Sequence, residues 1–132
     1  VLTKALVAQY DGFTPEGLDG HRVNGALTVG ENIGDLGGIT IAHKAYLLSL
    51  EGSEAPVIDG LTGSQRVFLG WGQVWRTVTR EAEQVRRLAI DPHSPPEFRA
   101  NVVRNLDEFH EAFGVSEGDG MWLDEHERVR IW

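Results

Sequence analysis

Residues 30–50 combine an apolar helical pattern with an unusual number of glycines, and no other stretch constrains the fold as strongly. Its apolar side chains recur at spacings of three and four, which predicts a helix from near Asn32 to Leu50: Leu36, Ile39, Ala42, Tyr46 and Leu50. Four glycines crowd the first two turns: Gly30, Gly34, Gly37 and Gly38. Glycine costs about 1 kcal/mol relative to alanine inside a helix. We therefore expect another element to approach this helix closely, because a solvated face would not need the glycines.

The rest of the chain predicts further helices, so the fold class is mainly α. Helices are expected over residues 1–10, from the cap Thr62, over residues 81–88, and after the caps Ser94 and Asn105. Residues 21–30 are predicted to form a short extended piece with a turn at Asn24-Gly25. Residues 51–60, rich in Gly, Ser, Pro and Asp, are predicted to form a loop.

Local patterns also predict how these helices begin, end and pack. Ser94-x-x-Glu97 has the form of a capping box with prolines at the first helical positions, and Asn105-x-x-Glu108 repeats the pattern with Asn as the cap. Gly114 is predicted to end the last helix. An apolar stripe at helical spacing is predicted to pack in the core: Phe68, Trp71, Trp75 and Val78.

Composition excludes several classes of protein. Twelve basic against 20 acidic side chains give a formal net charge of −8, which argues against nucleic acid as a partner because phosphates attract clustered Lys and Arg. No apolar run approaches the roughly 20 residues of a membrane-spanning helix, so we expect no membrane span in this segment. Without cysteine there is no disulfide, no Cys-based zinc site and no thiol nucleophile.

The chain opens on Val1 inside a predicted amphipathic helix, and no signal-peptide pattern is present. We therefore expect the 132 residues to be a segment of something larger. The sequence is compatible with a cytoplasmic protein and with a secreted protein.

Glu31 and Asp35 stand one helical turn apart, so both carboxylates project from the same face. Two like charges at this spacing repel unless something positive lies beside them, and a metal ion or a ligand histidine would supply that charge. The alternative is structural: Thr28-x-x-Glu31 would be a capping box and Asp35 a solvated surface acid. The neighbouring glycines favour the first interpretation.

Asp91, His93 and Arg99 form the second group of candidate functional residues. His93 lies in a turn stiffened by proline, and an acid two residues earlier can keep the imidazole protonated. Such a histidine is suited to stabilise a developing oxyanion, and an arginine offers a fork of donors to a carbonyl or carboxylate. The alternative is a loop histidine that caps a helix and a surface arginine.

The other histidines are weaker candidates. His21 and His43 have no partner at metal-ligand spacing. His110 and His126 are each followed by Glu, but no second histidine stands at the fifth position, so the chain contains no HExxH zinc helix. We expect both to be surface residues.

Taken in order, these motifs resemble the C-terminal part of the neprilysin and endothelin-converting-enzyme family of zinc metalloendopeptidases. Asn24-Gly25 looks like the family's NG, Leu27–Gly38 like its TLGENIADxGG, and Leu61–Trp75 like its LT…QVW segment. Further along, Asp91–Arg99 looks like DxHSPxxFR, Phe109–Phe113 like FxEAF, and Arg130–Trp132 like the terminal RVW. The resemblance implies the C-terminal helical part of a thermolysin-like (zincin) catalytic domain, spanning residues 1–132.

The resemblance also implies a role for each candidate residue. Glu31 would be the third zinc ligand, and Asp35 an acid that holds a ligand histidine. His93, oriented by Asp91, would stabilise the transition state, and Arg99 would bind the substrate carbonyl just after the scissile bond. Two further residues would help to line the adjacent pocket: Val74 and Trp75.

This chain departs from the family pattern in ways that shape the expectation. Arg76 and Val129 stand where animal members have cysteine, which indicates a bacterial-type member without disulfides. The HExxH helix, with its two ligand histidines and catalytic Glu, lies upstream in the family. We therefore expect one zinc ion, two ligands from that upstream remainder, peptide substrates, and no activity of this chain alone. The alternative is a catalytically silent helical module that binds or complements a partner segment.

Overall fold

The computed structural model describes residues 2–131, and every regular element in that range is a helix. The α-helices are α1 (Leu2–Asp11), α2 (Gly25–Ser49), α3 (Gly63–Val74), α4 (Glu81–Ile90), α5 (Pro96–Ala100) and α6 (Asp107–Phe113), and the 3-10 helices are η1 (Asn101–Asn105) and η2 (Glu125–Glu127). The β pairing in the described range is limited to an isolated bridge between Ile58 and Leu61. The prediction of a mainly α fold is confirmed.

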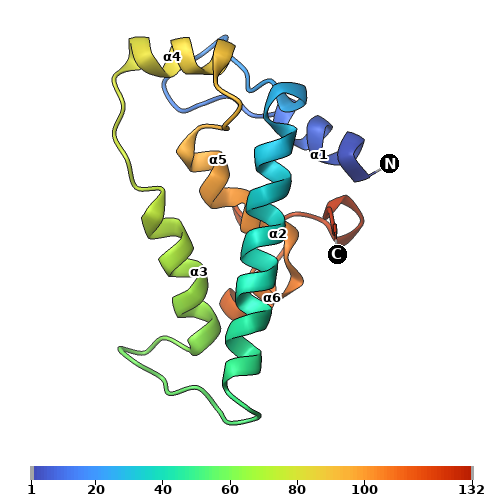
Figure 1. Cartoon of the computed structure of the whole chain (residues 1–132), viewed down its shortest axis with the longest axis vertical. Helices are drawn as coiled ribbons and strands as arrows, with labels where there is room; N and C mark the ends of the chain where they lie inside the picture. The colour runs from blue at the N-terminus through green and yellow to red at the C-terminus, as the bar shows by residue number, and fades with distance from the viewer. Residues whose placement is uncertain (1, 132) are drawn as a thin grey trace.

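Helix α2 is the long central element of the molecule (Figure 1). Helix α1 packs against it near its beginning, and α3 and η1 also contact it. Helix α3 runs alongside α2 in Figure 1, while α4 lies across one end. A search of the described helices finds none with the length and hydropathy needed to cross a bilayer.

The core lies where α1, α2 and α3 meet the continuous α5–η1 segment. Its buried side chains come from almost the full length of the chain: Leu6, Tyr10, Val23, Leu36, Ile39, Phe68, Phe98, Val102, Val103, Leu106 and Val129. Burial of a large apolar side chain contributes about 1.5–3 kcal/mol, so this cluster holds α2 and α5 in a fixed relation. Those two helices carry Glu31, Asp35 and Arg99, and the turn that leads into α5 carries Asp91 and His93.

Helix α2 begins earlier than its apolar spacing predicts. Asn24 is the N-cap, and its side chain accepts a hydrogen bond from the backbone N–H of Leu27 at 3.0 Å. The prediction of an extended piece over residues 21–30 is therefore wrong from Gly25 onward. The capping box considered at Thr28 is wrong too, because Thr28 lies inside the helix, where its hydroxyl donates to the carbonyl of Asn24.

The glycines of α2 differ in what surrounds them. A Cβ at Gly25 would collide with the carbonyl oxygen of Val7, so this glycine permits the close approach of α1. At Gly30, Gly34 and Gly38, apart from the adjacent residues and the nearby backbone of α2 itself, no atom of the described residues lies within 4 Å of the position a Cβ would take. The close neighbour that the sequence predicts at these three positions is not supplied by residues 2–131.

Helix α3 begins at the predicted cap but ends before the last residue of the predicted apolar stripe. Thr62 and Gln65 form a reciprocal capping box, with bonds of 3.2 Å and 2.9 Å. Phe68 is buried, as the apolar stripe predicts. The helix ends at Val74, so Val78 does not join that stripe and is fully exposed. The two tryptophans of the stripe are half-buried.

The two side-chain caps predicted near α5 and α6 are wrong. The hydroxyl of Ser94 bonds to Asn32 and not to the start of α5. The amide of Asn105 bonds to the side chain of Gln9 and to the carbonyl of Val102. Long-range partners take these polar groups because their side chains are buried, where an unpaired polar group is costly. The proline at the first position of α5 is confirmed.

The end of α6 follows the prediction, but one of its histidines does not. Gly114, with φ of 62°, adopts the left-handed conformation that terminates the helix. His110 was expected on the surface and is buried, with its Nε2 2.8 Å from the carbonyl oxygen of Arg104. His126 is exposed, as expected.

Candidate active site

The turn between α4 and α5 brings Asp91 and His93 into contact. Asp91 Oδ1 accepts two hydrogen bonds from His93, from the backbone N–H at 2.9 Å and from ring Nδ1 at 2.8 Å. These bonds, the backbone one first, hold the pKa of the Asp91 carboxyl below its ordinary value. The contact therefore stabilises the turn at pH values above the ordinary carboxyl pKa. This stabilisation is lost as the pH falls through the lowered pKa of Asp91. The spacing of the two residues predicts this pair, and the structure contains it.

Glu31 on α2 faces the other nitrogen of the same imidazole. Glu31 Oε2 lies 3.2 Å from His93 Nε2, and both side chains are close to half exposed. His93 therefore stands between two carboxylates, Asp91 on its own turn and Glu31 on the central helix. The two groups of candidate residues, separated in sequence, form one site.

Asp35 and Arg99 form a bidentate ion pair beside this histidine. Arg99 Nε and Nη2 each donate to a carboxylate oxygen of Asp35 at 2.7 Å. The side chains are 7% exposed for Asp35 and 17% for Arg99. The bonds to Asp35 raise the pKa of Arg99 above its already high ordinary value, so the guanidinium stays charged. The alternative of Asp35 as a solvated surface acid is wrong.

Helix α3 holds Arg99 from a second side. The guanidinium carbon lies 4.0 Å from the centroid of the Trp75 ring, a cation–π contact. Trp71 Nε1 donates to the backbone carbonyl of Arg99 at 3.1 Å. The hydroxyl of Tyr10 donates to the backbone carbonyl of Phe98, also at 3.1 Å. Side chain and main chain of Arg99 are thus both fixed by other elements, and the surface-arginine alternative is wrong.

The buried Asp35–Arg99 pair makes a testable contribution to stability. Breaking a buried ion pair leaves a charge without its partner, which typically costs about 3–5 kcal/mol. The change Asp35→Asn keeps one acceptor oxygen, so we expect a loss of about 2–3 kcal/mol in the free energy of unfolding. Denaturant unfolding of the metal-free full-length protein measures it.

The matched control breaks an exposed pair. Glu83 on α4 accepts hydrogen bonds from Arg86 and Arg87, but the side chains of the two arginines are more than half exposed and that of Glu83 is 33% exposed. We expect Glu83→Gln to leave the unfolding midpoint unchanged, because exposed ion pairs contribute little. Equal midpoints for wild type and Asp35→Asn would contradict a stabilising role for the buried pair.

A buried hydrogen bond joins α2 to the His93 turn. Ser94 Oγ donates to Asn32 Oδ1 at 2.7 Å, and Asn32 Nδ2 donates to Thr28 Oγ1 at 3.0 Å. Asn32 has 0% of its surface exposed and Ser94 3%. Sequence analysis missed both residues as part of the site; the only signal was their position next to Glu31 and His93.

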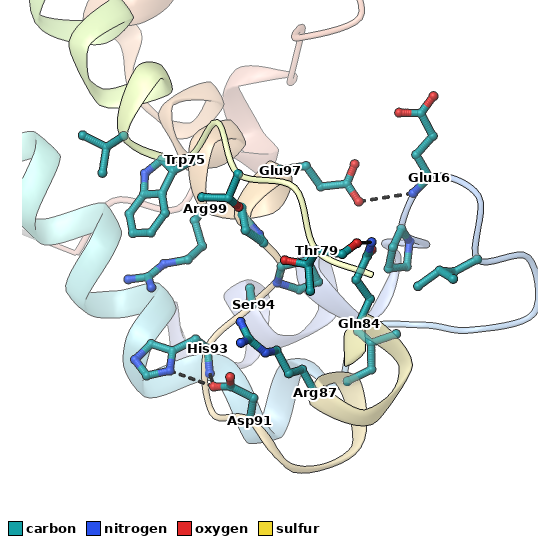
Figure 2. A pocket seen from close by; sticks show the side chains of 17 residues that line it. Glu16, Trp75, Thr79, Gln84, Arg87, Asp91, His93, Ser94, Glu97 and Arg99 are labelled. Atoms are coloured by element: carbon teal, nitrogen blue, oxygen red, sulfur yellow. Dashed lines mark hydrogen bonds and ion pairs between the residues drawn. The ribbon is translucent and has the colours of Figure 1, made fainter. Parts of the chain in front are cut away.

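A cleft of about 640 Å³ opens next to these residues. Val74 and Trp75 line it, together with Asp91, His93 and Arg99. Figure 2 shows the imidazole of His93 and the guanidinium of Arg99 both pointing toward α2, at the edge of the cleft. The polar ends of the candidate residues therefore gather along α2, where Glu31 and Asp35 lie.

The described residues do not form a complete metal site. No group of three or more His, Asp or Glu side chains in residues 2–131 is arranged to hold a metal ion. Glu31 fits the part of a single ligand, because its carboxylate is an oxygen donor, is partly open to solvent, and lies beside a face of α2 that carries glycines. A complete metal site here would need further ligands from outside these residues.

Comparison with known proteins identifies the class to which this fold and site belong. The chain matches peptidase family M13 over residues 2–129. It superposes on the zinc metalloprotease Zmp1 of Mycobacterium tuberculosis, solved with an inhibitor, with a TM-score of 0.96 and 62% identity, over 99% of this chain and 21% of that one. The same protein in its open state gives a TM-score of 0.95.

Animal relatives are less similar. Neprilysin-1 of Caenorhabditis elegans is 40% identical, and endothelin-converting enzyme 1 of the mouse 37%, each over 98% of this chain. The chain covers 18% and 17% of those proteins, so it spans about a fifth of the length of its relatives.

The fold and the matches place the chain in a family of zinc metalloproteases. The chain belongs to peptidase family M13, the neprilysin and endothelin-converting-enzyme family, and corresponds to the C-terminal part of its catalytic domain. The predicted family is confirmed. The higher identity to the mycobacterial protein agrees with the bacterial-type character predicted from the missing cysteines.

Proposed function

We propose that this chain supplies one zinc ligand and the transition-state residues of a peptide-hydrolysing metalloendopeptidase. The observation that carries the proposal is the contact of 3.2 Å between Glu31 and His93, because it places a candidate metal ligand beside a candidate proton donor. Arg99, held by Asp35, lies on the same side of α2. One metal ligand, one donor and one substrate anchor are what this segment contributes.

Glu31 would hold the zinc ion together with ligands from the upstream part of the protein. When bound, zinc supplies Lewis-acid polarisation of the peptide carbonyl and lowers the pKa of water toward about 7. Glu31 is presented from a regular helix whose other face is packed in the core, so its backbone position is fixed. The open positions at Gly30 and Gly34 leave room beside it for the segment that carries the other ligands.

The role proposed for Asp35 extends beyond its pair with Arg99. Its oxygens already accept from Nε and Nη2 of that guanidinium, and each carboxylate oxygen has a further lone pair. A ligand histidine from the upstream segment would donate to one of them, which fixes the imidazole tautomer and raises its basicity. Asp35 would then orient both a zinc ligand and a substrate anchor.

His93 would stabilise the negative charge that develops on the carbonyl oxygen. Asp91 accepts from Nδ1, so Nε2 is the nitrogen directed toward Glu31 and the reaction centre. A donor aimed at a developing oxyanion in a water-poor site is typically worth about 10²–10³ in rate. Asp91 keeps the ring in the orientation that this donation requires.

Arg99 would hold the substrate backbone in register. Its bonds to Asp35 use Nε and Nη2, which leaves Nη1 to donate to a substrate carbonyl. The Trp75 ring on the guanidinium face restricts it to one plane. Val74 and Trp75 would line the pocket for the neighbouring substrate side chain.

A reconstitution experiment tests the proposal. With zinc and a fluorogenic peptide, we expect no hydrolysis by residues 1–132 alone, because they hold one proposed ligand, and hydrolysis once the upstream segment is present in the same chain. Zinc content of both proteins, measured by atomic absorption, should follow the same pattern. A full-length protein that binds zinc but cleaves no peptide would favour the silent helical module over the peptidase.

A further inference from the structure

The two segments that carry Glu31 and His93 are joined by one buried hydrogen bond. Ser94 Oγ and Asn32 Oδ1 are 2.7 Å apart although the residues are 62 positions apart in the sequence. Asn32 follows Glu31 directly, and Ser94 follows His93 directly. A bond between these neighbours therefore fixes the distance between the two functional side chains.

Hydrogen bonds on α2 determine which way the Asn32 amide points. The hydroxyl of Thr28 donates to the carbonyl of Asn24 at 3.1 Å, so its oxygen accepts from Asn32 Nδ2 at 3.0 Å. The amide oxygen is then turned to Ser94, which has to donate. Each donor in this series of three hydrogen bonds has one acceptor, so the Asn32 amide has one favourable orientation.

The direct contact of His93 with Glu31 cannot hold the turn by itself. Both side chains are close to half exposed, and exposed charged contacts contribute little. The Ser94–Asn32 bond is shielded from water, where a hydrogen bond is stronger and its loss leaves a buried polar atom unpaired. The prolines at 95 and 96 stiffen the chain after Ser94 and transmit its position to α5.

We propose that Asn32 and Ser94 are positioning residues, which hold the His93 imidazole at the right place beside Glu31. This inference rests on the proposed function, because its value to the protein lies in the reaction that His93 would assist. Displacement of a reacting group by about 1 Å costs up to about 10²-fold in rate. Loss of a single hydrogen bond permits smaller shifts, so an effect of about tenfold is expected.

The test uses the full-length zinc-loaded protein and the change Ser94→Ala. We expect kcat for a fluorogenic peptide to fall about tenfold, with KM and zinc content unchanged, because the hydroxyl that is removed is buried and bonded to Asn32. Ser94→Thr keeps the hydroxyl and should retain most of kcat. A phosphinic peptide that imitates the tetrahedral state should bind Ser94→Ala about tenfold more weakly, while a product peptide should bind as before.

Ser64 on α3 provides a matched control, because its hydroxyl also bonds to a side chain of α2. Its hydroxyl lies 2.9 Å from Nε2 of the buried His43, so Ser64→Ala also removes a serine hydroxyl that ties α2 to another helix. We expect Ser64→Ala to shift the melting temperature as Ser94→Ala does, with kcat and phosphinic-peptide affinity unchanged. Only a positioning role of Ser94 would make the two variants differ in kcat and in phosphinic-peptide affinity.

Three results would overturn the inference. Unchanged kcat in Ser94→Ala, in a protein whose activity is abolished by Glu31→Ala, removes the positioning role and keeps the proposed function. Equal falls of kcat in Ser94→Ala and Ser64→Ala show an effect of stability alone. Absence of peptidase activity from the wild-type full-length protein removes the proposed function and the positioning role with it.

Discussion

Replacing Glu31 with alanine in the full-length protein should abolish stable zinc binding and, with it, peptide hydrolysis. Glu31 is the carboxylate of this chain that lies open beside His93, and it would provide one of three protein ligands. Loss of groups that only support a ligand already costs about 10–100-fold in affinity or activity, so loss of the ligand itself should exceed 100-fold. Competition with a chelator of known affinity measures the change.

The control for this experiment removes another helical carboxylate. Glu108 on α6 is exposed and lies outside the candidate site, so Glu108→Ala should keep full zinc content and activity. The thermal stability of both variants in metal-free form should match that of wild type. Full zinc occupancy in Glu31→Ala would end the assignment of Glu31 as a ligand.

Replacing His93 with alanine should lower kcat by about 10²–10³-fold with little change in zinc content. The proposed donation from Nε2 acts on charge that exists only in the transition state, so kcat should fall more than KM changes. Steady-state kinetics together with metal analysis separates these effects. Loss of zinc from the His93→Ala variant, or an unchanged kcat, would contradict the assignment of His93 as a residue that stabilises the transition state.

The tail of the chain offers a close structural match to this histidine. His126 has the same relation to Asp124 as His93 has to Asp91: its Nδ1 lies 2.6 Å from Asp124 Oδ1, and its backbone N–H donates to the same oxygen. It is exposed and is not among the residues that line the cleft. His126→Ala should therefore leave kcat unchanged, which shows that the Asp-x-His turn matters only where it faces Glu31.

Much of the fold followed from local patterns. The capping box at Thr62, the proline at the start of α5 and the left-handed Gly114 were predictable because each depends on side chains within a few residues. The predictions that failed, at Ser94, Asn105 and His110, concern polar side chains near helix ends that the fold buries. Ser94 and Asn105 bond to side chains far away in the sequence, and His110 Nε2 lies beside the carbonyl of Arg104. A local pattern carries no information on such tertiary contacts.

The sequence by itself determined the family and singled out the candidate functional residues one by one, because motif spacing identifies residue types and their neighbours. Only the tertiary structure decided which of them meet: Arg99 with Asp35 across 64 residues, Ser94 with Asn32 across 62, and His93 with Glu31. The physical reason is burial. The shared core of α2 and α5 brings these segments together. The Arg99–Asp35 and Ser94–Asn32 pairs then form because these largely buried polar groups need partners where water is excluded. The partly exposed contact of His93 with Glu31 follows from the position of the same turn beside α2.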